Sequence, residues 1–277
     1  MSKNNADDLP IFNGLLAFGK QIVKSRDMIW AMALRDFQIR HIGTVGGAIW
    51  AVVQPLALVT VFYFVFAVGF RVQSPENTPF ILWFVAGQVA WTFFNDNLLS
   101  ITSSVTGNAH LIKKTVFPSE IFAVIRVVSG TISHLIFFAI LVLMTIFLNI
   151  PFHIERILVL YYYFSMVIFV LGLGWLLSAL EPFFRDISQA MGIILNVWFW
   201  ATPIVWPENI IPERYHWVLD YNPIYYLVTG YRQSMIYQTV IWPDPWSTAY
   251  FWGVTAILFL LGITVFNRLK PEFVDVI

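Results

Sequence analysis

The chain has 277 residues, of which 58% are hydrophobic, 18% aromatic and only 12% charged, and its formal net charge is zero. Soluble domains carry about 25% charged residues, so this composition, with its positive mean hydropathy, excludes an ordinary soluble protein, and nothing in it suggests nucleic-acid binding. The lack of cysteine excludes disulfides and thiolate metal sites.

Several stretches reach the roughly 20 apolar residues that cross a bilayer as a helix. Because helices satisfy their own backbone hydrogen bonds in lipid, we predict an all-α polytopic membrane protein. A polar N-terminal segment covers 1–26, and a single transmembrane domain covers 27–277. The first residues contain no basic stretch leading into an apolar run, so we do not expect a cleaved signal peptide.

An amphipathic helix is predicted over 27–42. Its apolar residues recur at helical spacing, opposite Arg35, Gln38 and Arg40, which is typical of a helix lying in the membrane interface. The apolar set is Trp30, Ala31, Leu34 and Phe37, with Ile42 as a further candidate. Glycines would then allow a tight turn into the first span; they are Gly43, Gly46 and Gly47. The alternative is an ordinary juxtamembrane anchor.

Six transmembrane helices are predicted from the apolar stretches. They cover about 46–70, 79–103, 119–149, 157–180, 187–206 and 247–266. The segment between the last two is rich in proline, tryptophan and tyrosine, and breaks at Asn222-Pro223 into two helices too short to span. We expect these two helices to re-enter the outer side of the membrane as a gate region over 207–242; an extra pair of spans is the alternative.

Basic residues predict the orientation. If the N-terminus is cytoplasmic, the inside segments carry eleven lysines and arginines and the outside segments four, with Arg126 inside a span. The outside four are Arg71, Arg156, Arg214 and Arg232. We therefore expect both termini in the cytoplasm.

Motifs of nucleotide hydrolysis and other catalysis are missing. Residues 14–20 match the start of a phosphate-binding loop, but Gln21 follows where a serine or threonine would hold Mg²⁺, and no strand precedes them. There is no H-E-x-x-H and no G-x-S-x-G, and the five histidines have no ligand spacing. We predict no catalytic, cofactor or metal site, and an interhelical hydrogen bond for His134.

Two ionisable residues lie within predicted spans, Asp96 and Arg126. Both fall roughly 10–16 Å from the inner surface at 1.5 Å per residue. A charge in the membrane needs a partner, so we predict a structural Asp96–Arg126 pair, with a transport role as the alternative.

Two cytoplasmic segments, 107–118 and 181–186, mix apolar side chains with charge, as small surfaces that dock into a partner do. They also fit plain positively charged loops. Aromatic residues away from the span ends, among them Trp91 and Phe93, could stack on sugar rings, although an interfacial aromatic belt explains most of the aromatic content.

The chain resembles the permease subunit of type-2 ABC exporters, in the branch that exports O-antigen, teichoic acid and capsule. The resemblance rests on RDFQIRHIGTVGGAIWAVVQPLALVTVFYFVF, FVAGQVAWTFFNDNL, EPFFRDISQAMGIILNVWFWATPIVW, and the ordered pair N-A-H-L-I-K-K-x-x-F-P and N-P-x-x-x-L-x-x-x-Y-R. It implies a half-transporter in the bacterial inner membrane. Two copies would join two copies of an ATP-binding cassette subunit, which binds ATP and Mg²⁺, to export a polysaccharide on undecaprenyl diphosphate.

The resemblance also implies roles for residues. ATPase coupling falls to Asn108, His110, Leu111, Ile112, Lys113, Lys114 and Phe117, with a second contact at Glu181, Phe183, Arg185 and Asp186. The lipid head group would meet Arg35, Arg40 and His41, where His41 departs from the usual pattern. The aromatic residues themselves, and not the resemblance, suggest a sugar conduit lined by Tyr63, Phe64, Trp91, Phe93, Phe94 and Trp198. The outer gate would hold Pro207, Trp217, Tyr221, Pro223 and Tyr225.

Two other classes of function stay open at this point. An intramembrane transferase acting on a polyprenyl lipid would need clustered acid, base or metal-binding residues, and the sequence offers none. A membrane scaffold or simple channel would not need the two cytoplasmic segments.

Overall fold

The structure is a computed structural model that describes residues 11–42, 47–72, 78–114, 117–237 and 242–277. Within these ranges the chain forms helices joined by turns and contains no strand, so the all-α prediction is confirmed. The α-helices of ten or more residues are α1 (Ile11–Lys24), α2 (Arg26–Ile42), α3 (Trp50–Phe62), α4 (Phe80–Thr102), α7 (Ile121–Phe147), α8 (Leu158–Leu180), α9 (Asp186–Ala201), α11 (Pro223–Met235) and α12 (Pro245–Leu269).

Shorter helical pieces connect these helices. The α-helical pieces are α5 (Ser104–Gly107), α6 (Ala109–Lys114), α10 (Trp217–Asp220) and α13 (Phe273–Val276). The 3₁₀ turns are η1 (Gly47–Ile49), η4 (Ile154–Ile157), η5 (Glu208–Ile210), η6 (Glu213–Tyr215) and η7 (Lys270–Glu272), and a π-helix, η2 (Tyr63–Gly69), continues α3.

Four helical stretches of the described chain are long and apolar enough to cross a membrane. They are Trp50–Gly69, Ile121–Phe147, Ile154–Leu180 and Pro245–Val276. The other two predicted spans form helices, α4 and α9, that fall outside this group. Polar residues near the middle of α4, such as Gln88 and Asp96, lower its hydropathy, and α9 has only 16 residues. The count of six spans therefore stays a prediction.

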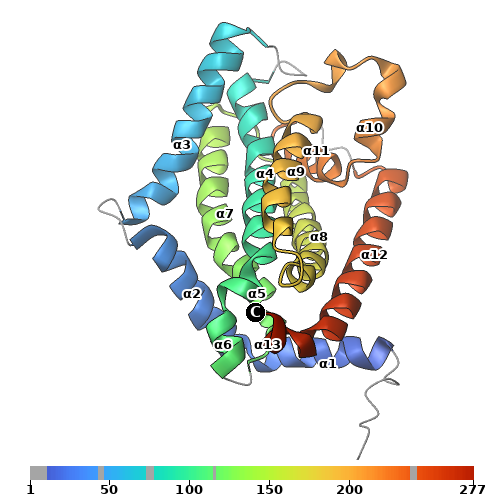
Figure 1. Cartoon of the computed structure of the whole chain (residues 1–277). Helices are drawn as coiled ribbons and strands as arrows, with labels where there is room; N and C mark the ends of the chain where they lie inside the picture. Colours follow the sequence, from blue (N-terminus) through green and yellow to red (C-terminus); the bar gives the residue numbers. More distant parts are fainter. Residues whose placement is uncertain (1–10, 43–46, 73–77, 115–116, 238–241) are drawn as a thin grey trace, which may run out of the picture.

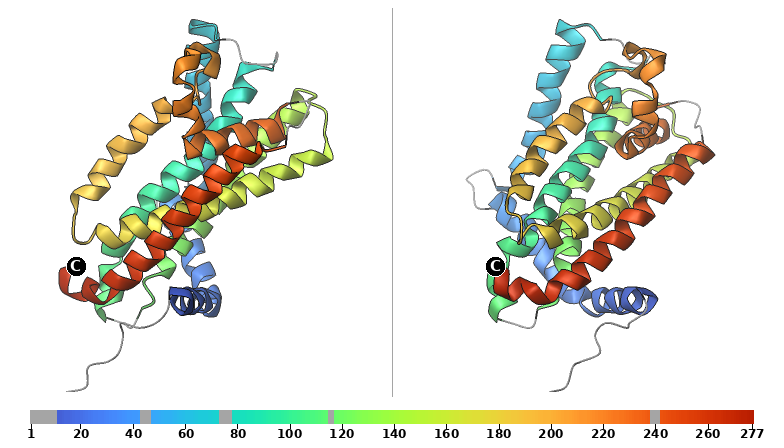
Figure 2. Two further views of the ribbon diagram at one scale, coloured as in Figure 1. Left: turned by 90° about the vertical axis from the view of Figure 1, so that its right-hand side faces the viewer. Right: turned by 45° about the vertical axis from the view of Figure 1, so that its right-hand side comes forward.

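Helix α4 is the centre of the bundle. It packs against α7, α8, α9 and α11, and most of its side chains are buried. Helices α8 and α12 run side by side (Figures 1 and 2) at very short range. A Cβ atom on Gly262 would lie 2.3 Å from the backbone oxygen of Gly172, so only glycine permits this approach.

Helix α1 lies across one end of the bundle (Figures 1 and 2), within the segment 1–26 that was predicted to be polar. The signal was present, because Leu15, Phe18 and Ile22 recur at helical spacing. The ring of Phe18 is buried edge-on against Trp175 of α8, with 4.8 Å between ring centroids. Residues 14–20, which resembled a phosphate-binding loop, are helical throughout.

Helix α2 shows that residues 27–42 are helical, as predicted, whereas their position in the membrane interface stays a prediction. Its buried residues, Ile29 and Ala33, pack against the start of α7, whereas Trp30 is exposed. Of the predicted turn glycines, Gly43 and Gly46 lie outside the described residues, while Gly47 begins η1 with a φ of +49°. This left-handed backbone favours glycine and fits a tight turn into α3.

The break at Asn222-Pro223 is confirmed. Helix α10 ends at Asp220, and α11 begins at Pro223 with the Asn222 side chain accepting a hydrogen bond from the backbone N–H of Ile224 at 3.0 Å. Helix α11 has 13 residues and packs against α4 and α8 rather than lying free.

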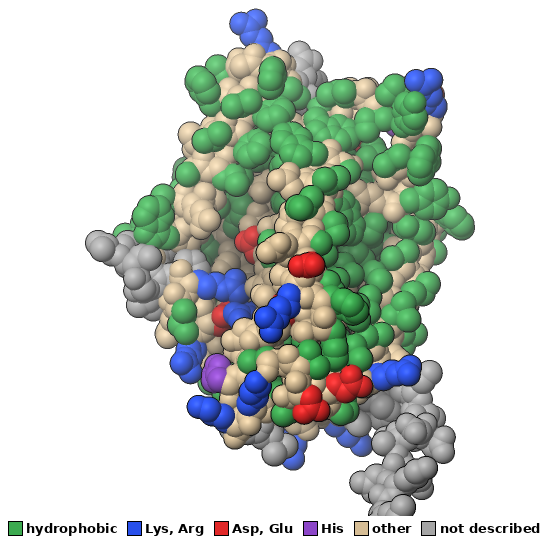
Figure 3. All heavy atoms as spheres, viewed as in Figure 1, with side chains coloured by type: hydrophobic (Ala, Val, Ile, Leu, Met, Phe, Trp, Pro, Cys, Tyr) green, Lys and Arg blue, Asp and Glu red, His purple; other side chains and the backbone are tan. Residues whose placement is uncertain are grey.

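Charged side chains gather at the end of the molecule that carries α1 and α6, and hydrophobic side chains cover most of the rest of the face in Figure 3. The C-terminal helix α13 lies at this same end (Figure 1).

Candidate functional site

A cavity of about 700 Å³ lies between α3, α4, α7 and α9, with Arg40 of α2 also on its wall. The face seen in Figure 3 is hollowed between α3 and α9. The polar residues that line the cavity are Arg40, Gln54, Gln88, Thr92, Asn95, Asp96, Asn97, Ser133, His134 and Asn196. Its aromatic lining residues are Trp50, Phe62, Trp91, Phe93, Phe137, Phe199 and Trp200.

This mixture of side chains has a chemical meaning. Aromatic ring faces cover the apolar faces of a sugar ring, while amide and hydroxyl groups exchange hydrogen bonds with sugar hydroxyls. The rings of Trp91 on α4 and Phe199 on α9 lie 5.5 Å apart and join two walls of the cavity. The walls therefore offer both the stacking surfaces and the hydrogen-bonding groups that a hydroxyl-rich molecule uses.

The structure brings two of the six predicted conduit aromatics to this cavity, Trp91 and Phe93. Phe94 is fully buried elsewhere, with its ring 5.3 Å from that of Trp198. The indole N–H of Trp198 donates to Asn222 at 2.9 Å, so this side chain supports α11. Tyr63 and Phe64 lie on η2 and are exposed, away from the cavity lining.

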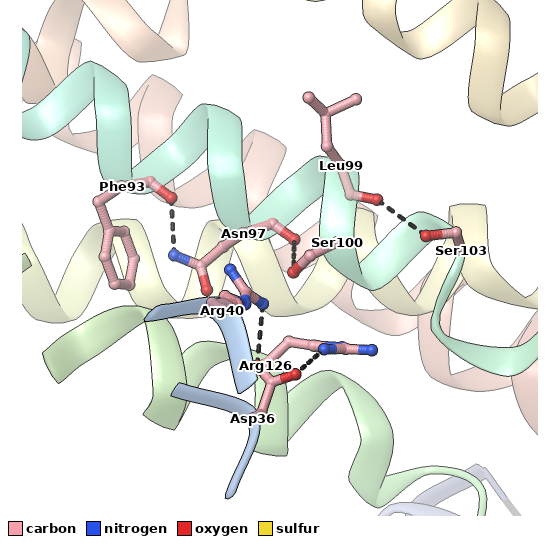
Figure 4. Close-up of polar contacts among 8 residues, drawn as sticks. All are labelled: Asp36, Arg40, Phe93, Asn97, Leu99, Ser100, Ser103 and Arg126. Atoms are coloured by element: carbon pink, nitrogen blue, oxygen red, sulfur yellow. Dashed lines mark hydrogen bonds and ion pairs between the residues drawn. The ribbon is translucent and has the colours of Figure 1, made fainter. Parts of the chain in front are cut away.

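The predicted Asp96–Arg126 pair is wrong. The guanidinium of Arg126 pairs with Asp36 of α2, and the other carboxylate oxygen of Asp36 accepts from Arg40 at 2.9 Å (Figure 4). Asp96 accepts a hydrogen bond from Asn95 at 2.9 Å and lines the cavity. The depth estimate compared only the two spans and left out α2, which packs directly on α7.

The three residues predicted to meet the lipid head group differ in their positions. Arg40 lines the cavity, and Arg35 is exposed on α2. His41 belongs to α2, but its side chain lies outside the described part of the chain. The head-group site itself stays a prediction.

The predicted coupling segments form two neighbouring surfaces. In α6, His110, Lys113 and Lys114 are exposed. Three further predicted side chains of this segment, those of Asn108, Leu111 and Ile112, are half-buried. Phe117 stacks on Phe122 of α7 with 4.7 Å between ring centroids.

The second surface is the turn 181–186 between α8 and α9. Arg185 and Asp186 are exposed, as is Phe184 with 63% of its surface free. Glu181 is buried instead and accepts a hydrogen bond from Ser188 at 3.2 Å. Phe183 is half-buried, with its ring 6.3 Å from that of Phe273.

The predicted gate residues surround the start of α11. Pro223 is its first residue, Tyr225 donates from its hydroxyl to Glu208, and Pro207 is buried. Trp217 and Tyr221 are largely exposed, and the ring of Tyr221 lies 5.3 Å from that of Tyr250.

Sequence reasoning missed the role of Arg232. Its side chain is buried and donates to the backbone oxygens of Trp83, Pro203 and Ile204 at 3.2, 2.7 and 2.9 Å. The guanidinium also lies 3.5 Å from the centre of the Trp83 ring. The sequence signal for this role was the position of Arg232 at the end of the N-P-x-x-x-L-x-x-x-Y-R pattern. Arg232 was predicted only to be one of the four basic residues outside.

The interhelical hydrogen bond predicted for His134 is confirmed. Its Nε2 atom lies 3.1 Å from the hydroxyl of Tyr231, so the hydrogen bond joins α7 to α11. Among the residues that the structure describes, no group of three or more histidine, aspartate or glutamate side chains is placed to hold a metal ion.

The fold and the cavity together define a helical membrane protein with a polar and aromatic hollow along its helices. The chain belongs to the ABC-2 type transporter family, because the sequence model of that family matches residues 28–236. It is therefore a transport subunit.

Its curated relatives include two proteins of Klebsiella pneumoniae named "O-antigen export system permease protein RfbA". They are 29% and 28% identical over 257 residues, covering 91% of this chain and 95% of each relative. A Myxococcus xanthus protein of the same name is 24% identical over 260 residues, covering 92% of this chain and 97% of the relative.

Proposed function

We propose that this chain is the membrane half of an ATP-driven exporter that moves an O-antigen-like polysaccharide, carried on a polyprenyl diphosphate lipid, across the bacterial inner membrane. The cavity between α3, α4, α7 and α9 carries this proposal, because its aromatic and amide walls match a sugar chain. The three relatives, named as O-antigen export permeases, support it.

Two copies of the chain would face each other, with two ATP-binding subunits beneath α6 and the turn 181–186. Lysine and arginine side chains gather at that end (Figure 3), which supports a cytoplasmic placement of this end and of both termini. ATP and Mg²⁺ would bind to the partner subunit. Short helices α10 and α11 would form the outer gate.

A matched pair of glycines tests the transport path. A Cβ atom on Gly192 of α9 or Gly253 of α12 meets no atom within 4 Å, so both helices accept a larger side chain there. Gly192 lines the cavity and Gly253 does not. We expect Gly192→Phe to reduce surface O-antigen strongly and Gly253→Phe to leave it near the wild-type level.

The measurement is export of polysaccharide by cells, with the amount of each variant in the membrane determined in parallel. Equal export by both variants at equal abundance would contradict the transport path. The absence of an ATP-binding subunit that co-purifies with the wild-type chain would contradict the exporter assignment itself.

A further inference from the structure

The chain does not simply leave the bundle after α12. It turns through η7 (Lys270–Glu272) into α13 (Phe273–Val276), and α13 packs against α6 (Figure 1). This C-terminal segment comprises residues 270–277. In the fold it lies between the two candidate surfaces for the partner.

Phe273 is the centre of this arrangement. Its side chain is fully buried, and its ring lies 6.3 Å from that of Phe183 in the turn 181–186 and 5.4 Å from that of Phe266 on α12. The helix that carries it rests on α6. One short segment therefore touches both surfaces at once.

An ion pair fixes the start of the same segment. The ammonium of Lys270 lies 2.6 Å from the carboxylate of Glu120, which is buried directly before α7. The backbone oxygen of Glu120 accepts a hydrogen bond from the indole of Trp175 on α8 at 3.0 Å. The segment is thus connected to the ends of α7 and α8 as well as to α12.

These contacts have a mechanical consequence for the cavity. The piece containing α5 and α6 joins α4 to α7, and the turn 181–186 joins α8 to α9. A force on only one of these surfaces would act first on its own two helices. A segment that holds both surfaces together makes the same force act on α4, α7 and α9, which form three walls of the cavity.

We propose that residues 270–277 form a coupling strap, with Phe273 as its positioning residue, which makes α6 and the turn 181–186 respond to the partner ATPase as one body. The role in coupling rests on the proposed exporter function. The mechanical link between the two surfaces does not depend on that function and can be measured in the chain alone.

The lack of native cysteines allows clean site-directed spin labelling. Labels at His110→Cys and Phe184→Cys, both at exposed positions, report the separation of the two surfaces by electron–electron double resonance in nanodiscs. Singly labelled chains identify distances between two copies. We expect one narrow distance distribution with Phe273 present, a broad one for Phe273→Ala, and recovery of most of the narrow distribution for Phe273→Leu.

Val274→Ala is the matched control, because Val274 is the next residue of α13 and 51% exposed. It should leave the distribution unchanged. Lys270→Met, which removes the partner of Glu120, provides a second variant should Phe273→Ala fail to fold, and it should also broaden the distribution. A narrow distribution that persists in every strap variant that folds would overturn the strap.

The complex with its ATPase gives the functional measurement. We expect Phe273→Ala to lower export per ATP hydrolysed, with an unchanged KM for the lipid-linked substrate. An unchanged ratio would overturn the coupling role. Failure of the wild-type chain to bind any ATPase would overturn the proposed function, while the label distances would still decide on the mechanical link.

Discussion

The carboxylate of Asp36 on α2 forms an ion pair with the guanidinium of Arg126 on α7, and this pair joins the helix predicted to lie in the membrane interface to a wall of the cavity. Both side chains are mostly buried, with 16% and 23% of their surface exposed. Arg40 shares the same carboxylate and lines the cavity. Charged contacts therefore connect α2 to the walls of the cavity.

A double-mutant cycle measures this pair. We expect Asp36→Asn and Arg126→Gln to lose less stability together than the sum of the single changes, with an interaction free energy of about 0.5–3 kcal/mol, as for residues sharing one ion-pair network. Equilibrium unfolding in detergent gives the four values. Arg35→Gln, an exposed change on the same helix, should lie within about 0.5 kcal/mol of wild type. Additive single changes would show that the two side chains do not stabilise each other.

We expect the free energy of unfolding to depend strongly on the shape of the side chain at position 232. Arg232→Lys keeps the charge but cannot donate along three directions from a planar group, so one or more of the carbonyls of Trp83, Pro203 and Ile204 loses its donor. We expect a loss of about 2–4 kcal/mol in unfolding free energy, since each unpaired buried group costs about 1–3 kcal/mol. Arg214→Lys, an exposed change, should be nearly neutral. Equal effects in the two variants would be inconsistent with this hydrogen-bonding role of Arg232.

The residues at the start of α12 predict that folding stability depends on pH. Asp244 accepts hydrogen bonds from the backbone N–H and the hydroxyl of Ser247, at 2.8 and 3.0 Å. These bonds, with the backbone bond as the largest contribution, hold the pKa of Asp244 below its ordinary value of 3.8. Because folding lowers this pKa, the capping contribution is complete above the ordinary value and is lost as the pH falls through the folded-state value.

Thermal unfolding between neutral and acidic pH checks this expectation. Asp244→Asn retains a capping oxygen without a titrating carboxyl, so its Tm should fall less than that of the wild-type chain as the solution is acidified. Parallel Tm curves for the two proteins would show that Asp244 does not contribute in this way.

Local signals in the sequence predicted the helices well. The boundaries at Asn222-Pro223 and the helix over 27–42 follow from proline chemistry and from apolar spacing, both of which depend on neighbouring residues. Helix α1 was missed although Phe18 and Ile22 lie on one face, because its glycines and lysines made the segment look merely polar.

Contacts between distant segments were harder to predict. Asp96 and Arg126 were paired because they share a depth in the membrane, but depth fixes one coordinate only, and Asp36 reaches Arg126 from a helix outside the two spans compared. Phe94 and Trp198 were grouped with Trp91 because all are aromatic, yet the rotation of each helix decides which ring faces the cavity. That rotation depends on packing with helices far away in the chain.

The buried position of Arg232 also has a consequence for the order of biosynthesis. Its carbonyl partners belong to Trp83, Pro203 and Ile204, which precede it by 149, 29 and 28 residues. A ribosome completes these residues before Arg232 leaves it, since domains assemble from the N-terminus during synthesis. A charge that is buried in a protein without hydrogen-bond partners is strongly destabilising. All three carbonyl acceptors have therefore been synthesised before the Arg232 guanidinium emerges from the ribosome.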